Sequence, residues 1–155
     1  MKKQRIIFGL GSNLGDREFY LDSAVRELEN ALHLTNSKKS KIFKNPAMLL
    51  PNSPKEWDQE FFNIAFSAEI DLEKFSPEKI LEAAKKIEKK LGREDRERWS
   101  PREIDIDILA IDELFLHIDH KLIIPHQGLF EREFFLKTAE EIELQLLKKL
   151  QYGVK

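Results

Sequence analysis

The sequence predicts an α+β protein with a ferredoxin-like β-α-β-β-α-β core, in which helices pack on an antiparallel sheet, and with a helical addition at the C-terminal end. Two observations predict this fold. Short runs of β-branched and aromatic residues alternate with two amphipathic helical periods in that order, and a third helical period follows. The 155 residues, of which 41% are hydrophobic, suffice for one ordinary core, so we expect a single domain over residues 1–155.

The first half of the chain supplies the first strand, the first helix and the second strand. Residues 5–10 (RIIFGL) predict a strand. The helix that follows has Asp16 as its N-cap and an apolar face at Leu21, Ala24, Val25, Leu28 and Leu32. Residues 41–44 indicate a weak strand. Residues 45–60 contain Pro46, Pro51 and Pro54 and predict a long loop, a kind of segment that often binds ligands.

The next strand and helix follow directly. Residues 61–70 (FFNIAFSAEI) predict a strand. Ser76 as N-cap and Pro77 in the first turn begin a helix, and Gly92 ends it. The apolar face of this helix is expected at Ile80, Ala84, Ile87 and Leu91.

The last strand follows a charged loop over residues 93–102. Residues 103–110 (EIDIDILA) alternate between polar and apolar side chains, which predicts a strand with one buried face. A short apolar stretch at 122–124 leads into Pro125 and His126. The final helix is expected at about 137–151, with Ala139, Ile142, Leu146, Leu147 and Leu150 on one side.

Composition excludes several classes of function. The chain has no cysteine, which rules out disulfides, cysteine-liganded zinc, iron–sulfur clusters and thiol nucleophiles. The net charge of −2 argues against a general nucleic-acid binder, which carries a basic excess. No run approaches the roughly 20 apolar residues of a membrane span, and the run at 6–8 is too short for a signal peptide. We therefore expect a cytoplasmic protein without nucleic-acid or membrane partners.

The strongest chemical signal is the pair Asp105 and Asp107 on one predicted strand. Alternate side chains share a face, so the two Cα atoms should lie about 6–7 Å apart with both carboxylates pointing the same way. Such a pair suits hard cations such as Mg²⁺ bound together with a polyphosphate. The competing interpretation is the polar face of a half-exposed strand, although Asp is disfavoured in strands.

Arginine is concentrated just before these carboxylates. Arg93, Arg96, Arg98 and Arg102 lie within ten residues, with Trp99 among them. Guanidinium groups bind phosphate bidentately, so the segment suits a phosphate-rich ligand. Three acidic residues share the loop, however, and a solvated loop with internal ion pairs remains an alternative.

Three further positions have both a structural and a functional interpretation. Gly11 would let a ligand approach the backbone of a strand-to-helix turn. Asn63 lies in an apolar run, where its amide either bonds to the backbone or contacts the edge of a ligand. His126 follows a proline at a strand end, in a rigid turn that also suits a binding residue.

Taken in order, the motifs resemble those of the 6-hydroxymethyl-7,8-dihydropterin pyrophosphokinase family of folate biosynthesis. They are residues 11–16 (GSNLGD), 62–65 (FNIA), 92–93 (GR), 98–109 (RWSPREIDIDIL), and Pro125 and His126 with Arg132 and Phe134. The resemblance runs from about residue 5 to residue 136. It implies a pyrophosphokinase domain of ferredoxin-like fold, acting as a monomer, that transfers the β,γ-pyrophosphoryl group of ATP to the hydroxymethyl oxygen of the pterin and releases AMP.

The resemblance also implies roles for residues. Asp105 and Asp107 would hold two Mg²⁺ ions and would be catalytic together with Arg93 and Arg102. The ATP site would comprise Glu88 (near the ribose), Arg93, Arg98, Trp99, Arg102, Ile108, His126 and Arg132. The pterin site would comprise Gly11, Asn45, Pro46, Phe61, Asn63, Phe134 and Trp99, whose loop closes over the site.

The sequence departs from the family pattern at several positions. Asp95 stands where the family has a second loop arginine, with Arg96 one residue later. Ser100 replaces a common glycine, and Phe61 replaces a common tyrosine. The loop at 45–60 is longer than usual and lacks the glycine–proline pair.

Three other functions fit parts of the sequence. A ferredoxin-like RNA-binding module is disfavoured by the acidic net charge and by the two carboxylates beside the loop. A regulatory domain that binds nucleotide without turnover would explain Asp95. A kinase acting on another hydroxymethyl heterocycle would differ in releasing ADP rather than AMP.

Overall fold

A five-stranded antiparallel sheet forms the centre of the molecule in the computed structural model, which describes residues 3–47, 49–93 and 101–153. The strand order is β2-β4-β1-β5. Strand β3 pairs with the same edge of β4 as β2 does, at the beginning of β4. The strands are β1 (Gln4–Ser12), β2 (Thr35–Lys39), β3 (Phe43–Asn45), β4 (Phe61–Ile70) and β5 (Asp105–Ile111). This arrangement confirms the predicted ferredoxin-like core.

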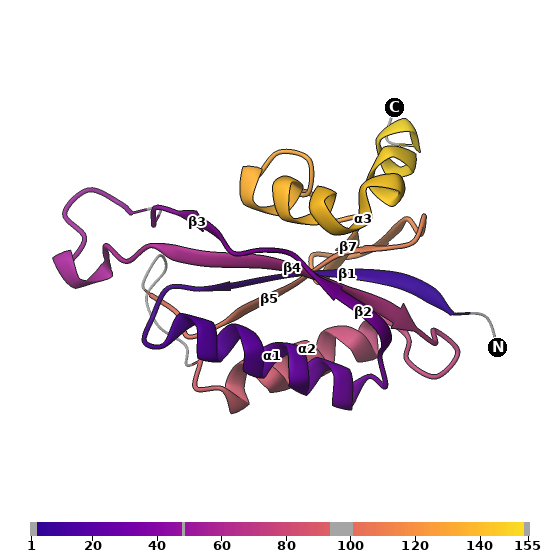
Figure 1. Ribbon diagram of the computed structural model, residues 1–155, viewed down its shortest axis with the longest axis horizontal. Helices are drawn as coiled ribbons and strands as arrows, with labels where there is room; N and C mark the ends of the chain where they lie inside the picture. Colours follow the sequence, from indigo (N-terminus) through magenta and orange to yellow (C-terminus); the bar gives the residue numbers. More distant parts are fainter. Residues whose placement is uncertain (1–2, 48, 94–100, 154–155) are drawn as a thin grey trace.

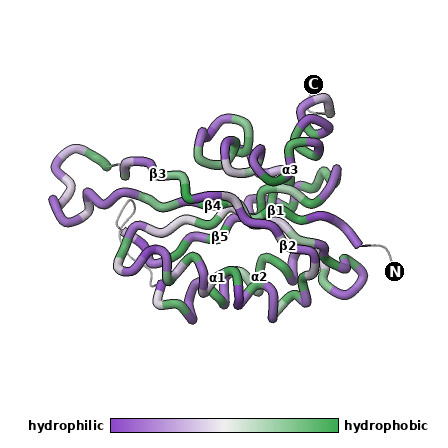
Figure 2. The backbone as a smooth tube through the Cα atoms, in the orientation of Figure 1, coloured by the Kyte–Doolittle hydropathy of each residue, from purple (hydrophilic) through white to green (hydrophobic). Residues whose placement is uncertain are grey.

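Helices cover both faces of the sheet. Helices α1 (Arg17–Ala31) and α2 (Pro77–Lys90) lie on one face, and α3 (Glu133–Gly153) lies on the other (Figure 1). Hydrophobic residues recur along the strands and helices (Figure 2), and buried clusters of them fill the space between the layers. The larger core includes Phe8, Leu28 and Phe66 below the sheet, and a smaller one includes Ile7 and Leu147 under α3. Each face of the sheet therefore packs against its own hydrophobic core.

The predicted helix signals on α1 and α2 are confirmed. The Asp16 carboxylate accepts a hydrogen bond from the Phe19 N–H at 3.1 Å. The Ser76 hydroxyl accepts one from the Lys79 N–H at 3.3 Å, and Pro77 occupies the first helical position. Gly92 follows α2 with φ of +105°, a conformation that favours glycine and turns the chain away from the helix axis.

The elements that the sequence did not predict are short or polar. Strand β2 (TNSKK) is exposed along its whole length, so it carries no hydrophobic alternation. Strands β6 (Leu116–Ile118) and β7 (Leu122–Ile124) form a hairpin of which only the second stretch was predicted. The weak strand expected at 41–44 is β3, and the expected loop at 45–60 contains the 3₁₀ turn η1 (Lys55–Trp57).

Helix α3 begins four residues earlier than predicted and is interrupted at Glu143. This residue has φ of −137° and ψ of 48°, which are not helical values. The Glu143 carboxylate accepts hydrogen bonds from Arg5 Nη2 at 2.7 Å and from Ser67 Oγ at 2.7 Å. The kink therefore coincides with an anchor between α3 and the sheet. No helix among the described residues is long and apolar enough to cross a membrane.

Candidate active site

The two carboxylates of β5 lie on one face of the sheet, as the alternation predicts. Asp105 and Asp107 stand opposite Gly11 and Gly9 of β1 in the antiparallel register. Their neighbours Ile104, Ile106 and Ile108 are each at most 4% exposed, in the core beneath α1 and α2. The carboxylates therefore lie on the face that α3 covers only in part.

Two arginines contact Asp105. Arg93, just after α2, places Nη2 3.3 Å from Asp105 Oδ1. Arg102, just before β5, donates through Nη1 to both carboxylate oxygens of Asp105 at 3.3 Å. The backbone of Arg102 is fixed in turn by Asn13, whose Oδ1 accepts from the Arg102 N–H at 2.8 Å and whose N–H donates to the Arg102 carbonyl at 3.1 Å. Two guanidinium groups thus lie at the mouth of the site on anchored main chain.

Asp107 differs from Asp105 in its electrostatic environment. Burial, then the nearby Asp105 and Glu88 carboxylates, raise its pKa to about 6. Its side chain is still 40% exposed, so Asp107 lies in an open cleft and not in the core. Lys85 and Arg132 oppose this shift, and a cation bound beside Asp105 and Asp107 would relieve the remaining repulsion between the carboxylates.

His126 faces Asp107 from the turn after β7. Its Nδ1 accepts a hydrogen bond from the Gly128 N–H at 2.9 Å, so a neutral ring carries its proton on Nε2, which lies 3.7 Å from Asp107 Oδ1. Burial and the nearby Arg132 lower the pKa of His126. The ring packs edge-on against Phe135 at 5.0 Å. His126 is thus oriented to donate a hydrogen bond into the site.

Amide and aromatic side chains line the other end of the site. Asn63 is 5% exposed on β4, and its Nδ2 donates to the Phe43 carbonyl at 3.2 Å and to Asn45 Oδ1. Its Oδ1 faces the space over Gly11, 3.0 Å from where a Cβ on that glycine would lie. The bond to the Phe43 carbonyl confirms the structural interpretation of Asn63. The other end of the amide borders the cleft, and a ligand contact there stays a prediction.

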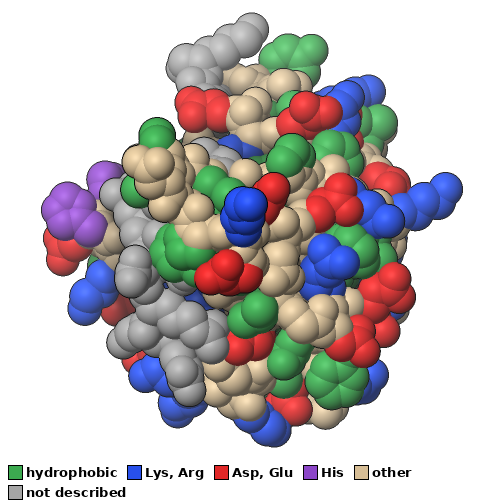
Figure 3. Space-filling model, turned by 90° about the vertical axis from the view of Figure 1, so that its left-hand side faces the viewer, with side chains coloured by type: hydrophobic (Ala, Val, Ile, Leu, Met, Phe, Trp, Pro, Cys, Tyr) green, Lys and Arg blue, Asp and Glu red, His purple; other side chains and the backbone are tan. Residues whose placement is uncertain are grey.

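These two ends belong to one cleft of about 310 Å³. Fourteen residues line it: Gly11, Asn45, Phe61, Asn63, Lys85, Glu88, Arg93, Arg102, Asp105, Ile106, Asp107, Arg132, Phe134 and Phe135. Acidic and basic side chains are interspersed over this end of the molecule (Figure 3). The cleft therefore offers opposite charges at one end and amide and aromatic groups at the other.

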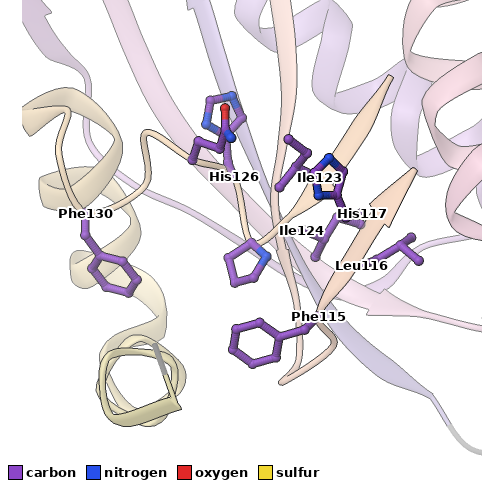
Figure 4. A pocket seen from close by; sticks show the side chains of 9 residues that line it. Phe115, Leu116, His117, Ile123, Ile124, His126 and Phe130 are labelled. Atoms are coloured by element: carbon purple, nitrogen blue, oxygen red, sulfur yellow. The ribbon is translucent and has the colours of Figure 1, made fainter. Parts of the chain in front are cut away.

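An apolar pocket of about 440 Å³ adjoins His126. Its lining includes Phe115 from the chain before β6, Ile123 from β7 and Phe130 from the chain before α3, which surround the pocket in Figure 4. His126 also lines this pocket, while its Nε2 lies near Asp107 in the cleft. The histidine therefore stands between two cavities.

The structure places the remaining predicted residues in different environments. The Ile108 side chain is buried in the core and does not line the cleft. Pro46 is exposed and also lies outside the lining. Arg98 and Trp99 lie outside the described residues, as do three positions discussed with them: Asp95, Arg96 and Ser100.

Sequence reasoning missed three residues of the site. Asn13 fixes the Arg102 backbone, and its only signal is its place in the glycine-rich turn after β1. Lys85 lines the cleft from α2, where it is one of several lysines on the helix surface. Phe135 supports His126 and is indistinguishable in sequence from a core residue. Asn13 depends on a contact with a segment 89 residues away, which local pattern does not show.

The donor set of the cleft fits magnesium. Mg²⁺ binds oxygen ligands and is commonly held by one or two carboxylates together with substrate phosphates. Asp105 and Asp107 supply such oxygens on one face, and the described residues contain no group of three or more His, Cys, Asp or Glu side chains able to hold a metal alone. A metal here would therefore complete its coordination with a ligand or with water.

Fold and cleft together define a class of protein: a ferredoxin-like α+β domain with a polar cleft at one end of the sheet, in which arginines and carboxylates lie next to amide and aromatic side chains. The sequence model of the 7,8-dihydro-6-hydroxymethylpterin-pyrophosphokinase (HPPK) family matches residues 7–144. The chain belongs to this family.

Two kinds of curated relative are similar to this chain. The 2-amino-4-hydroxy-6-hydroxymethyldihydropteridine pyrophosphokinase of Aquifex aeolicus is 39% identical over 89% of this chain and 79% of its own length. The folate synthesis bifunctional protein of Chlamydia muridarum is 42% identical over 88% of this chain and 30% of its own length. The chain thus spans about a third of that larger relative.

Solved structures share the fold. The Plasmodium falciparum HPPK-DHPS crystal structure superimposes with a TM-score of 0.61 at 13% identity, over 90% of this chain and 41% of that one. A crystal structure of HPPK-DHPS in complex with substrates gives a TM-score of 0.61 at 14% identity, over 92% of this chain. The ferredoxin-like core and its C-terminal helix are therefore shared with HPPK domains.

Proposed function

We propose that this protein transfers a diphosphate group from ATP to 6-hydroxymethyl-7,8-dihydropterin, yielding AMP and the pterin diphosphate in folate biosynthesis. The observation that carries this proposal is the placement of Asp105 and Asp107, with two arginines on one side and an amide and aromatic pocket on the other, in a single cleft. Family membership and the relatives named pyrophosphokinase support it.

The aromatic end of the cleft suits the pterin. Phe61 and Phe134 offer flat apolar surfaces, and Asn63 offers a fixed amide whose Oδ1 accepts hydrogen bonds from ring nitrogens. Asn45 holds the Asn63 amide in place. A flat heterocycle bound here would direct its hydroxymethyl group along the sheet toward the aspartates of β5.

The charged end suits the triphosphate. Asp105 and Asp107 would hold two Mg²⁺ ions, which when bound would neutralise phosphate charge and orient the triphosphate. Arg93, Arg102 and Arg132 would bind phosphate oxygens and stabilise the charge that develops on them. His126 would donate from Nε2 to a phosphate oxygen. The hydroxymethyl oxygen of the pterin would form a bond to the β-phosphorus and lose its proton to solvent. The bond between the β-phosphorus and the oxygen that bridges to the α-phosphorus would break, and AMP would leave with that oxygen.

The experiment that tests the proposal is analysis of the nucleotide product. Protein, Mg²⁺, ATP and the hydroxymethyl dihydropterin are mixed, beside a double variant carrying Asp105→Asn and Asp107→Asn. We expect one AMP for each pterin diphosphate and no turnover by the variant. ADP as product would instead indicate a kinase on this fold, and nucleotide binding without turnover would indicate a regulatory domain.

We also propose that the protein acts as a monomer, as expected from its sequence. Light scattering at the concentrations used for the assay tests this. A dimer whose dissociation abolished turnover would contradict it.

A further inference from the structure

Glu88 is a buried acidic residue at the C-terminal end of α2. It is 3% exposed, and both of its carboxylate oxygens accept hydrogen bonds from protein groups. Oε2 accepts from the Ile106 N–H at 2.7 Å, and Oε1 accepts from Arg93 Nη1 at 2.8 Å. A buried carboxylate with both oxygens engaged is well satisfied without a ligand.

The bond to Ile106 fixes the strand that carries the aspartates. Strand β5 lies at the edge of the described sheet and pairs with β1 on one side only. Ile106 lies between Asp105 and Asp107, and its N–H points away from β1 to the Glu88 carboxylate. The Glu88 carboxylate therefore accepts the hydrogen bond that a neighbouring strand would otherwise accept. This bond fixes the backbone between Asp105 and Asp107.

The bond to Arg93 fixes a guanidinium group at the mouth of the cleft. The Arg93 N–H donates to the Glu88 carbonyl at 3.0 Å, so main chain and side chain of Arg93 are both held by the same residue. Gly92 makes this possible with its φ of +105°. The other end of the guanidinium contacts Asp105. Arg93 thus links Glu88 to the predicted metal ligands.

We propose that Glu88 is a positioning residue that holds Arg93 and the Asp105–Asp107 segment in the geometry that binds a metal–polyphosphate, and that it does not bind the ribose of the nucleotide. This inference rests on the proposed function. It assigns Glu88 an effect on the phosphate end of the ligand, whereas a ribose contact would affect only ligands that contain the sugar.

The test compares a ligand with ribose and a ligand without it. Binding of the Mg²⁺ complexes of a non-hydrolysable ATP analogue and of inorganic tripolyphosphate is measured by calorimetry for the wild type and for Glu88→Gln. Glutamine keeps the size of the side chain but can accept at one oxygen only. We expect both ligands to bind about tenfold more weakly, as for the loss of one charge-assisted hydrogen bond. The ratio of the two affinities should stay unchanged.

The matched control is Glu82→Gln, which removes the same charge from an exposed position on the same helix. It should change neither affinity. Arg93→Gln should weaken the binding of both ligands. Adding Glu88→Gln to Arg93→Gln should weaken binding further by clearly less than tenfold, because the two residues act through one contact. Circular dichroism checks that each variant is folded.

Other outcomes would overturn the inference. Weaker binding of the ATP analogue with unchanged binding of tripolyphosphate would make Glu88 a ribose ligand. Unchanged binding of both ligands would make it a structural residue only. Failure of the wild type to bind either ligand would overturn the proposed function as well, whereas binding by the wild type with no effect of Glu88→Gln would overturn this inference alone.

Discussion

At the scale of single residues, Gly11 sets the space that the cleft leaves beside Asn63. It lies on β1 opposite both Asn63 of β4 and Asp105 of β5. A Cβ at this position would lie 3.0 Å from Asn63 Oδ1 and 3.6 Å from the Phe61 ring. The absence of a side chain here keeps the amide oxygen accessible from the cleft.

Gly11→Ala should therefore weaken binding of the pterin. The added methyl group would displace the Asn63 amide by a few tenths of an ångström and obstruct its accepting oxygen. We expect about tenfold weaker pterin binding, which corresponds to about 1.4 kcal/mol. Affinity for the nucleotide, measured separately by calorimetry, should change little. An equal loss for both ligands would contradict this account.

Gly9→Ala is the matched comparison on the same strand and face. Its Cβ would lie 2.9 Å from the Phe135 ring, which packs against His126 and Phe134. Overpacking of this kind costs about 1–3 kcal/mol. We expect the loss in the free energy of unfolding, measured by urea denaturation, to be larger for this variant than for Gly11→Ala. A larger loss in the free energy of unfolding for Gly11→Ala would indicate that the tighter contact is the one at the cleft.

At this scale, local pattern predicted only part of the site. The alternation of 103–110 was enough to place Asp105 and Asp107 on one face, because strand geometry alone decides it. The spacing of the arginines did not show that Arg93 and Arg102 both contact Asp105, since this depends on where α2 ends in space. Asn13 was missed for the same reason, because its partner is 89 residues away.

At the scale of elements, the kink in α3 is held by one polar cluster. Glu143 Oε2 accepts from Arg5 Nε at 3.1 Å, from Arg5 Nη2 at 2.7 Å and from Ser67 Oγ at 2.7 Å. These bonds join α3 to β1 and β4. The part of α3 before the kink carries Phe134 and Phe135, so the anchor also fixes one wall of the cleft.

Glu143→Gln should destabilise the fold. The variant leaves the Arg5 guanidinium half-buried without its carboxylate, which costs about 2–3 kcal/mol for hydrogen bonds to a charged group. Urea denaturation measures the change. Glu140→Gln, on the same helix and without an ion pair among the described residues, should leave stability within about 0.5 kcal/mol of the wild type. Equal effects of the two variants would show that the cluster contributes nothing specific.

The elements themselves were predictable where local chemistry decides them. Strand β4 has the predicted bounds, and α2 begins at the predicted cap, because apolar pattern and capping residues act over a few positions. Strand β2 was missed because it is stabilised by pairing with β4 and not by its own composition. The kink at Glu143 was missed because a contact with the sheet, and no proline or glycine, produces it.

At the scale of the whole molecule, ligands of the cleft should stabilise the fold. The cleft joins β1, β4, β5, α2 and the start of α3, so a bound ligand opposes their separation. A ligand at one hundred times its dissociation constant adds about 2.7 kcal/mol, and about 2–4 °C per kcal/mol is typical at this size. We expect the melting temperature to rise by about 5–10 °C with Mg²⁺ and a non-hydrolysable ATP analogue together.

The double variant with Asp105→Asn and Asp107→Asn is the control for this shift. It removes the negative charge and one oxygen ligand from each side chain while leaving the backbone of β5 in place. Its melting temperature should not respond to Mg²⁺ and the analogue. A full shift in the variant would place the nucleotide elsewhere on the molecule.

The central position of β1 also affects how the chain folds as it is synthesised. This first strand pairs only with β4 and β5, so Ile6 meets Ile111 more than a hundred positions later. At about 5–20 residues per second on the ribosome, its apolar side chains wait several seconds for their last partner. The five-stranded sheet cannot be completed until β5 has emerged from the exit tunnel, so the strand that carries the two aspartates completes the sheet before α3 packs on it.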